Sequence, residues 1–287
     1  MLIKETGEIR RTLVLVLFAN LFVTLLKAVF GIMSNSLSMI ADSVHSLFDS
    51  TSNVVGIIAI QLASKPPDGD HPYGHRKYET IATLFIALLL MITAFEIVET
   101  AFRRLMNPST PDIIAVTYAV MVLTMVINFF VARYEHRAGR RLGSSILVAD
   151  SLHTRSDIFA SLSVLVSFVA VSLGYPMLDS LVAFAIVILI SKTAFSIIRG
   201  ASESLCDVCM VDMNRVREVI KSVAGVIDCH KVRARGGAEH MYMDFHILVD
   251  PRISLEKGHE ISHQVEERLK KSFPGVVDVT VHIEPKR

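Results

Sequence analysis

Several features typical of soluble and nucleic-acid-binding proteins are missing from this 287-residue chain. The formal net charge is only +1 and no long block of like charge occurs, which argues against nucleic acid as a partner. Three cysteines, an odd number, argue against a disulfide framework and for a reducing compartment. The chain lacks a G-x-x-x-x-G-K-[ST] sequence, which excludes ATP-driven pumping by this chain alone. Its first residues lack the pattern of a signal peptide, and we expect them to stay cytoplasmic.

Long apolar segments dominate what is present. Hydrophobic residues make up 52% of the chain and the mean hydropathy is +0.49, too apolar for a soluble enzyme of this length. A segment of about 20 apolar residues crosses a hydrocarbon core of roughly 30 Å. Six such segments predict transmembrane helices over residues 13–33, 37–63, 80–102, 113–132, 146–173 and 178–198.

Basic residues predict the orientation of these six helices. An even number of spans places both termini on the same side of the lipid bilayer. By the positive-inside rule, the segments rich in Lys and Arg are cytoplasmic. We therefore expect a multi-pass protein of the cell (inner or plasma) membrane with cytoplasmic termini. The basic residues concerned are Lys4, Arg10, Arg11, Lys65, Arg76, Lys77, Arg133, Arg137, Arg140 and Arg141.

Two pairs of potential metal ligands occur inside apolar segments. His45 precedes Asp49 by four residues, and His153 precedes Asp157 by the same interval. This spacing places each pair on one helix face, so two packed helices would bring two imidazoles and two carboxylates together. Each ionisable group at membrane depth costs about 2.5–3.5 kcal/mol, which favours a functional role. The pattern predicts a tetrahedral site for a divalent transition metal; the alternative is histidines that only hydrogen-bond between helices.

Other acidic residues lie close to these pairs. Asp42 and Asp150 each precede a proposed histidine ligand by three residues, so they could replace it or orient it. We favour the orienting role or a helix-end position. The roles of Glu96 and Glu99 stay open at this point.

The composition changes after Arg199, and residues 207–287 form a separate predicted soluble domain following a membrane domain of residues 1–206. The pattern predicts a helix over 214–223, strands over 229–235 and 240–249, a helix over 254–273 and a strand over 276–284. This αββαβ order implies a small open-faced α+β sandwich. Along the second strand, apolar residues alternate with polar ones, so one face should meet the helices and the other should carry potential ligands.

The six spans, the paired H-x-x-x-D motifs, the loop PPDGDHPYGHRKYE and the histidine-bearing tail together resemble the cation diffusion facilitator family. The resemblance covers the whole chain and is strongest to the prokaryotic zinc and iron efflux branch. It implies six transmembrane helices followed by a cytoplasmic, metallochaperone-like αββαβ domain for metal binding and dimerisation. It also implies a homodimer that carries divalent metal ions.

The resemblance also implies two further metal sites. In the loop, Asp68, His71 and His75 match a second metal site, with Asp70 as an alternative to Asp68. The competing interpretation is that these residues only form a loop and bind no metal. Lys77 and Asp207 resemble an interlock between the two domains. In the tail, Glu284 replaces the aspartate usual in the nearest members of the family. The competing interpretation of the tail histidines is that they are solvated surface residues. The tail residues that match a binuclear site are His230, His246, His259, His282 and Glu284.

These observations lead to the hypothesis of zinc export in exchange for protons, without catalysis. Imidazole and carboxylate bind metal only when deprotonated, so metal and protons compete for the same groups. Nitrogen ligands in tetrahedral geometry favour zinc, and the two-His, two-Asp set resembles family members that prefer it. Iron, cadmium, manganese, cobalt and nickel are the alternative substrates.

Two rival hypotheses come from other functional classes. A membrane-anchored sensor or scaffold would use the tail to bind zinc without transport. The segment from His259 through Glu260 to His263 matches the H-E-x-x-H signature of zinc metallopeptidases. The small size of the domain and the missing G-x-x-H continuation argue against a peptidase. Cys206 and Cys209 form a lone C-x-x-C, which we interpret as incidental.

Overall fold

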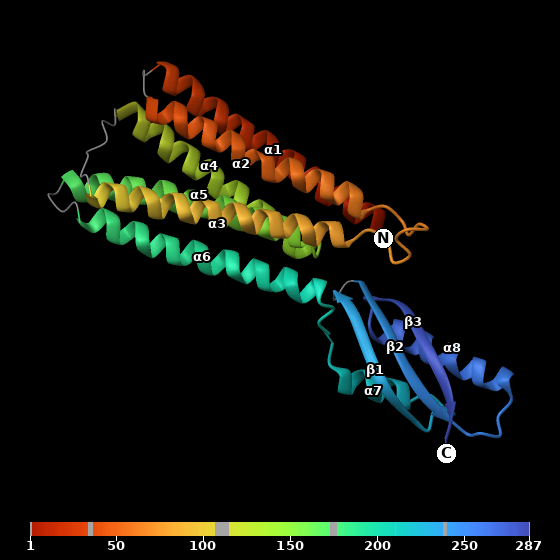
Figure 1. Ribbon diagram of the computed structural model, residues 1–287. Coiled ribbons are helices and arrows are strands. Elements are labelled where there is room, and N and C mark those ends of the chain that lie inside the picture. The colour runs from red at the N-terminus through yellow and green to blue at the C-terminus, as the bar shows by residue number, and fades with distance from the viewer. Residues whose placement is uncertain are drawn as a thin grey trace. The chain divides into compact units, whose positions relative to one another are not determined.

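The computed structural model describes residues 2–33, 37–106, 115–172, 177–209, 211–237 and 240–286 (Figure 1). The chain forms two compact units, Met1–Ala201 and Ser202–Arg287, which we call the membrane unit and the C-terminal unit. The first unit is helical and the second is α+β, as the sequence predicted.

Six long helices build the membrane unit. Within the described part of the chain, five of them contain stretches long and apolar enough to cross a membrane. The remaining one, α5, carries His153 and Asp157. The helices are α1 (Leu2–Met33), α2 (Leu37–Ala63), α3 (Lys77–Met106), α4 (Ala115–Arg141), α5 (Ser145–Ser172) and α6 (Met177–Leu205).

Small and apolar side chains fill the contacts between these helices. Helix α1 packs against α2 and α4, and α5 packs against α3 and α4 and touches α2. At Gly56 of α2, an added Cβ would lie 3.3 Å from side chains of Leu13 and Ile146, so glycine allows α1, α2 and α5 to approach closely. Large apolar side chains such as Phe18 and Phe95 remain exposed on the outer surface of the unit, where lipid tails would meet them.

A polar contact fixes the beginning of α5 beside α3. The Oε1 atom of Glu79 accepts a hydrogen bond from the Ser144 hydroxyl at 2.6 Å and from the Ile146 backbone N–H at 3.4 Å. An acidic group at a helix N-terminus satisfies free N–H groups and interacts favourably with the helix dipole. The contact therefore sets the position of the helix that carries His153 and Asp157.

The C-terminal unit follows the predicted αββαβ order. Its elements are α7 (Met213–Lys221), β1 (Asp228–Gly237), β2 (His240–Val249), α8 (Leu255–Ser272) and β3 (Val276–Pro285). The sheet has the order β1-β2-β3, with β2 antiparallel to β1 and parallel to β3.

Burial along β2 alternates as the sequence predicted. Met243, Phe245 and Ile247 lie in the core formed with α7 and α8, and Phe245 is only 1% exposed. The strand register pairs His246 with His230 on one side and with His282 on the other. Three neighbouring strands therefore place three imidazoles in one row across the sheet.

Candidate metal centres

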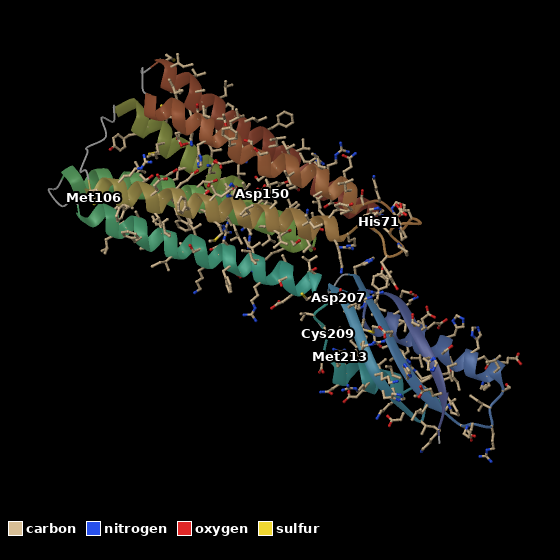
Figure 2. All side chains as sticks on the ribbon, viewed as in Figure 1. His71, Met106, Asp150, Asp207, Cys209 and Met213 are labelled. Carbon is tan, nitrogen blue, oxygen red and sulfur yellow. The ribbon has the colours of Figure 1, made fainter. Side chains whose placement is uncertain are left out.

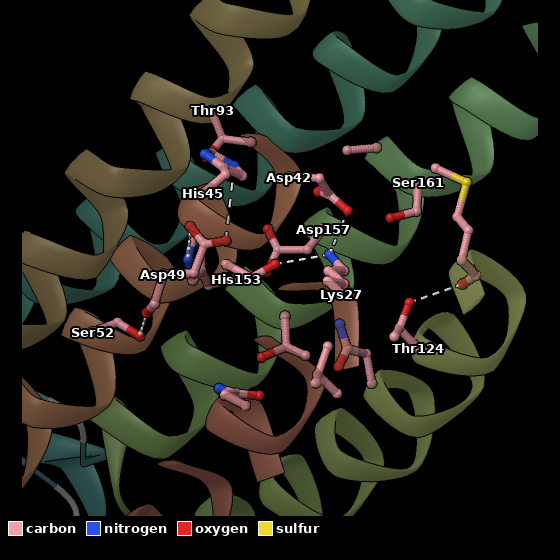
Figure 3. A pocket seen from close by; sticks show the side chains of 17 residues that line it. Lys27, Asp42, His45, Asp49, Ser52, Thr93, Thr124, His153, Asp157 and Ser161 are labelled. Atoms are coloured by element: carbon pink, nitrogen blue, oxygen red, sulfur yellow. Dashed lines mark hydrogen bonds and ion pairs between the residues drawn. The ribbon is translucent and has the colours of Figure 1, made fainter. Parts of the chain in front are cut away.

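The two histidine–aspartate pairs of the membrane unit line a single cavity (Figure 3). His45 and Asp49 project from α2, and His153 and Asp157 project from α5. The cavity has a volume of about 150 Å³. Since a cavity needs only about 10–15 Å³ to hold one water molecule, it has room for a metal ion with some of its waters.

Asp49 lies between the two imidazoles. Its Oδ1 atom is 3.7 Å from His153 Nε2, and its Oδ2 atom is 3.8 Å from His45 Nε2. Around tetrahedral zinc, with bonds of about 2.0–2.1 Å, neighbouring ligand atoms lie about 3.3–3.4 Å apart. The two Asp49 distances exceed this spacing by about 0.3–0.5 Å and end on different oxygens of its carboxylate. Among the described residues, the compact ligand groups are those of the loop and the tail, so the membrane set is more open than a preformed tetrahedral site.

Several of the proposed ligand atoms are available to an ion. Both ring nitrogens of His153 and the Oδ1 atom of Asp157 are buried and make no hydrogen bond to any described residue. A buried polar atom without a partner costs free energy, on the order of 1–3 kcal/mol. A cation bound to one ring nitrogen of His153 and to Asp157 Oδ1 would satisfy two of these three atoms, and so the residues fit a metal.

Two further charged residues lie near the proposed ligands: Lys27, which lines the cavity, and Glu96, which lies outside its lining. Lys27 of α1 pairs with Asp42 of α2, with 2.9 Å between Nζ and Oδ2. Glu96 of α3 approaches the other side of the His45 ring, with 4.0 Å between its Oε2 atom and Nδ1. A lysine inside the first apolar segment is a sequence signal for Lys27, because charged residues at membrane depth mark functional sites.

Asp42 and Asp150 have partners other than the histidines that the sequence suggested. Asp42 pairs with Lys27. Asp150 is buried within the helices of the membrane unit, where it accepts hydrogen bonds from the Ser52 hydroxyl and the Asn53 amide (Figure 2). These bonds join α5 to α2 and help to hold together the two helices that carry the histidine–aspartate pairs.

The loop between α2 and α3 gathers the second predicted ligand set. Asp68 Oδ1 lies 3.1 Å from His71 Nδ1, and Asp68 Oδ2 lies 3.3 Å from His75 Nε2. The backbone N–H of His71 donates to Asp68 and is the main cause that lowers the pKa of this carboxyl group. The backbone N–H of Asp70 also donates to Asp68, and the compact ligand group contains Asp68 rather than Asp70.

The open face of the C-terminal sheet gathers most of the third set. His230, His246 and Glu284 offer ligand atoms that all lie within 4.8 Å of one another. Glu284 is 2.8 Å from His246 Nδ1, 3.3 Å from His230 Nε2 and 3.6 Å from His282 Nε2. The hydrogen bond with His246 is the main cause that lowers the pKa of Glu284, so this carboxyl group is ready to bind a cation.

His259 does not join this group among the described residues. It lies on the exposed side of α8, where its ring stacks edge-on against His263 with 4.7 Å between centroids. Glu260, between these histidines, forms an ion pair with Lys257 at 2.7 Å, and this contact lowers the pKa of Glu260. The ion pair leaves the carboxylate engaged rather than free to activate a water molecule.

Two further predictions concern the interlock between Lys77 and Asp207 and the cysteine pair Cys206 and Cys209. Lys77 begins α3, and Asp207 lies in the C-terminal unit, so their interlock stays a prediction. Asp207, two residues after the last residue of α6, has a φ of 55°, which marks a change in chain direction. Cys206 and Cys209 are both free and exposed.

Long apolar helices in which two histidine–aspartate pairs line one cavity, followed by a small α+β unit, are the arrangement expected of a membrane metal transporter. Residues 13–206 match the model of the cation efflux transmembrane domain, and residues 210–286 match that of the cytoplasmic domain of cation efflux proteins. The chain belongs to the cation efflux family, also called the cation diffusion facilitators. Its members are transporters rather than enzymes, which confirms that prediction and removes the peptidase hypothesis.

Known relatives cover nearly the whole chain. An uncharacterized transporter of Methanocaldococcus jannaschii is 30% identical over 290 residues, with 96% of this chain and 98% of the relative covered. The manganese efflux system protein MneS of Bacillus subtilis is 30% identical over 271 residues, covering 93% and 92%. Among solved structures, a variant of the MamM CTD is 28% identical and covers 26% of this chain and 92% of that one, with a TM-score of 0.25.

Proposed function

We propose that this chain exports zinc from the cytoplasm in exchange for protons, as a homodimer in the cell membrane. Family membership establishes divalent cation efflux. The observation that carries the finer proposal is the position of Asp49 between His45 and His153, with buried ligand atoms of His153 and Asp157 open beside it. Transport through the membrane unit requires such a site at membrane depth, and these four residues supply it.

The chemistry of the four ligands favours zinc. Two imidazole nitrogens and two carboxylate oxygens in tetrahedral arrangement suit zinc, whereas manganese prefers a larger number of oxygen ligands. Two Bacillus subtilis relatives are named as manganese efflux proteins, which makes manganese the competing substrate to test. Iron, cadmium, cobalt and nickel complete the set of ions for competition experiments.

Protons provide the driving force through the same four groups. Imidazole and carboxylate bind metal only in their deprotonated forms, so entry of protons from the far side weakens metal binding and promotes release. The reverse exchange on the cytoplasmic side restores the metal-binding form. One site alternately occupied by metal and protons is sufficient for antiport.

The loop and tail sites have proposed supporting roles. The loop group of Asp68, His71 and His75 would bind a second metal ion close to the membrane unit. In the C-terminal unit, metal at the sheet would stabilise the associated form of two chains by mass action, in line with the dimer domain that residues 210–286 match. The tail would thereby bias transport without carrying the ions. The tail ligands proposed are His230, His246, His282 and Glu284, with His259 added by the resemblance alone.

Reconstitution tests the proposal directly. Purified full-length chain in liposomes, loaded with a zinc indicator on one side and a pH indicator on the other, should show zinc uptake coupled to proton movement in the opposite direction. Zinc should be carried in preference to manganese at equal concentration. Zinc binding without flux would instead support the sensor hypothesis, and zinc flux without proton movement would refute antiport.

A further inference from the structure

A buried lysine lies inside the proposed transport cavity. Lys27 of α1 is 7% exposed, and its ammonium group is 2.9 Å from Asp42 Oδ2 and donates to the Ser46 hydroxyl at 2.8 Å (Figure 3). Both partners belong to α2, and Ser46 directly follows the proposed ligand His45. The positive charge is therefore fixed beside the metal ligands.

The pair could act simply as a contact between α1 and α2, but its position indicates more. Lys27 and Asp42 line the same cavity as the four proposed ligands. Asp42 lies three residues before His45, a spacing that places both side chains on one face of α2. The Asp42 side chain is 43% exposed, so its carboxylate has access to the cavity and is held by Lys27 alone among the described charged residues that line it.

The charges of the cavity balance one divalent ion. Asp42, Asp49 and Asp157 contribute three negative charges when ionised, and Lys27 contributes one positive charge. The sum of minus two matches a single M²⁺ bound with neutral histidines. Without Lys27 the sum would be minus three, and Asp42 would be free to act as a fifth, oxygen ligand.

We propose that Lys27 sets the metal selectivity of the transport site by holding Asp42 in an ion pair and so keeping it out of the coordination sphere. This inference rests on the proposed function of His45, Asp49, His153 and Asp157. Zinc is satisfied by four mixed nitrogen and oxygen ligands, whereas manganese gains from additional oxygen ligands. The ion pair thus favours zinc by withholding an oxygen ligand and a negative charge.

The variants Lys27→Met and Asp42→Asn change the charge of the cavity in opposite directions. Lys27→Met adds a net negative charge and frees Asp42, so the ratio of manganese to zinc flux should rise about ten-fold or more. Neighbours that hold and orient metal ligands typically change metal affinity by about 10–100-fold, which sets this expectation. Asp42→Asn leaves Lys27 unpaired, so the zinc concentration for half-maximal flux should increase. The double variant restores a charge of minus two, so both measures should return toward wild type.

The experiment compares these variants and two controls as full-length chains in liposomes, with flux of zinc and manganese measured separately. Lys27→Arg keeps the positive charge and should keep the wild-type ratio. Lys192→Met removes an exposed lysine of α6 outside the cavity and should also keep it. A purely structural contact would lower zinc and manganese flux of Lys27→Met by the same factor and leave their ratio unchanged, and that result would overturn the proposal.

Two further comparisons cover the cases in which a variant fails to insert or the wild type does not transport. If Lys27→Met fails to insert, Asp42→Asn and the double variant still test the idea, since equal half-saturating zinc concentrations in both would refute it. The wild-type chain separates this inference from the function on which it rests. A wild type that carries no metal refutes the proposed function, whereas a wild type that transports, with an unchanged ratio in Lys27→Met, refutes only the role of Lys27.

Discussion

Replacing Asp49 by Asn is the most direct test of the membrane site. The substitution keeps the size and shape of the side chain and removes only its charge. Asp49 approaches both His45 and His153, at 3.8 and 3.7 Å, so its loss disturbs two of the other three proposed ligands. Its side chain is 21% exposed toward the cavity, and we expect the variant to fold and insert normally.

The size of the effect follows from the number of ligands. Structural zinc in zinc-finger peptides binds with about 10 kcal/mol or more, and we take the lower value as the reference. If four ligands share this equally, the loss of one costs about 2.5 kcal/mol, which is about 70-fold in affinity. Because Asp49 contacts both imidazoles, about 70-fold is the minimum expected increase in the zinc concentration for half-maximal flux.

The assay is initial zinc flux into proteoliposomes over a wide range of zinc concentrations. Glu99→Gln serves as the control, because Glu99 is a carboxylate of α3 outside the cavity and pairs with Arg103 at 2.5 Å. The control should follow the wild-type curve. A curve for Asp49→Asn that coincides with wild type would refute the assignment of this site.

Three further predictions concern the C-terminal unit. Phe245→Ala should destabilise it by about 3–5 kcal/mol in chemical denaturation, whereas Val277→Ala, at a 42% exposed position, should change little. His246→Ala should weaken zinc binding by the full chain in calorimetry more than His259→Ala, and equal effects would place His259 in the site. Glu284→Gln should weaken zinc binding by the full chain at pH 6 in calorimetry. The lowered pKa of Glu284 keeps it ionised there, and its stabilising contacts are lost only as the pH falls through that pKa.

Much of the fold could be predicted from periodicity. The transmembrane helices follow from apolar segments of membrane length, because a segment in lipid must satisfy its own backbone hydrogen bonds. The alternation along β2 predicted which residues face the core, since successive side chains on a strand point to opposite faces. These are local properties, and a local pattern is sufficient to determine them.

The sequence also predicted that His45 with Asp49 and His153 with Asp157 would each lie on one helix face, and the four side chains line one cavity. Their role as metal ligands stays a prediction. The sequence could not show which helices pack together or how far apart the pairs lie. The 3.7 Å approach of Asp49 to His153 depends on the packing of α2 against α5, which the small residue Gly56 allows.

Tertiary structure alone decided the partners of the remaining charged residues. Asp42 and Asp150 occupy equivalent sequence positions relative to a histidine, yet one pairs with Lys27 of α1 and the other accepts hydrogen bonds from Ser52 and Asn53 of α2. Spacing along one helix fixes the direction of a side chain, whereas the charge or donor that it meets comes from another helix. The sequence by itself therefore determined the elements and the residue types available at the candidate site, and only the packing of helices distant in sequence determined the environment of that site.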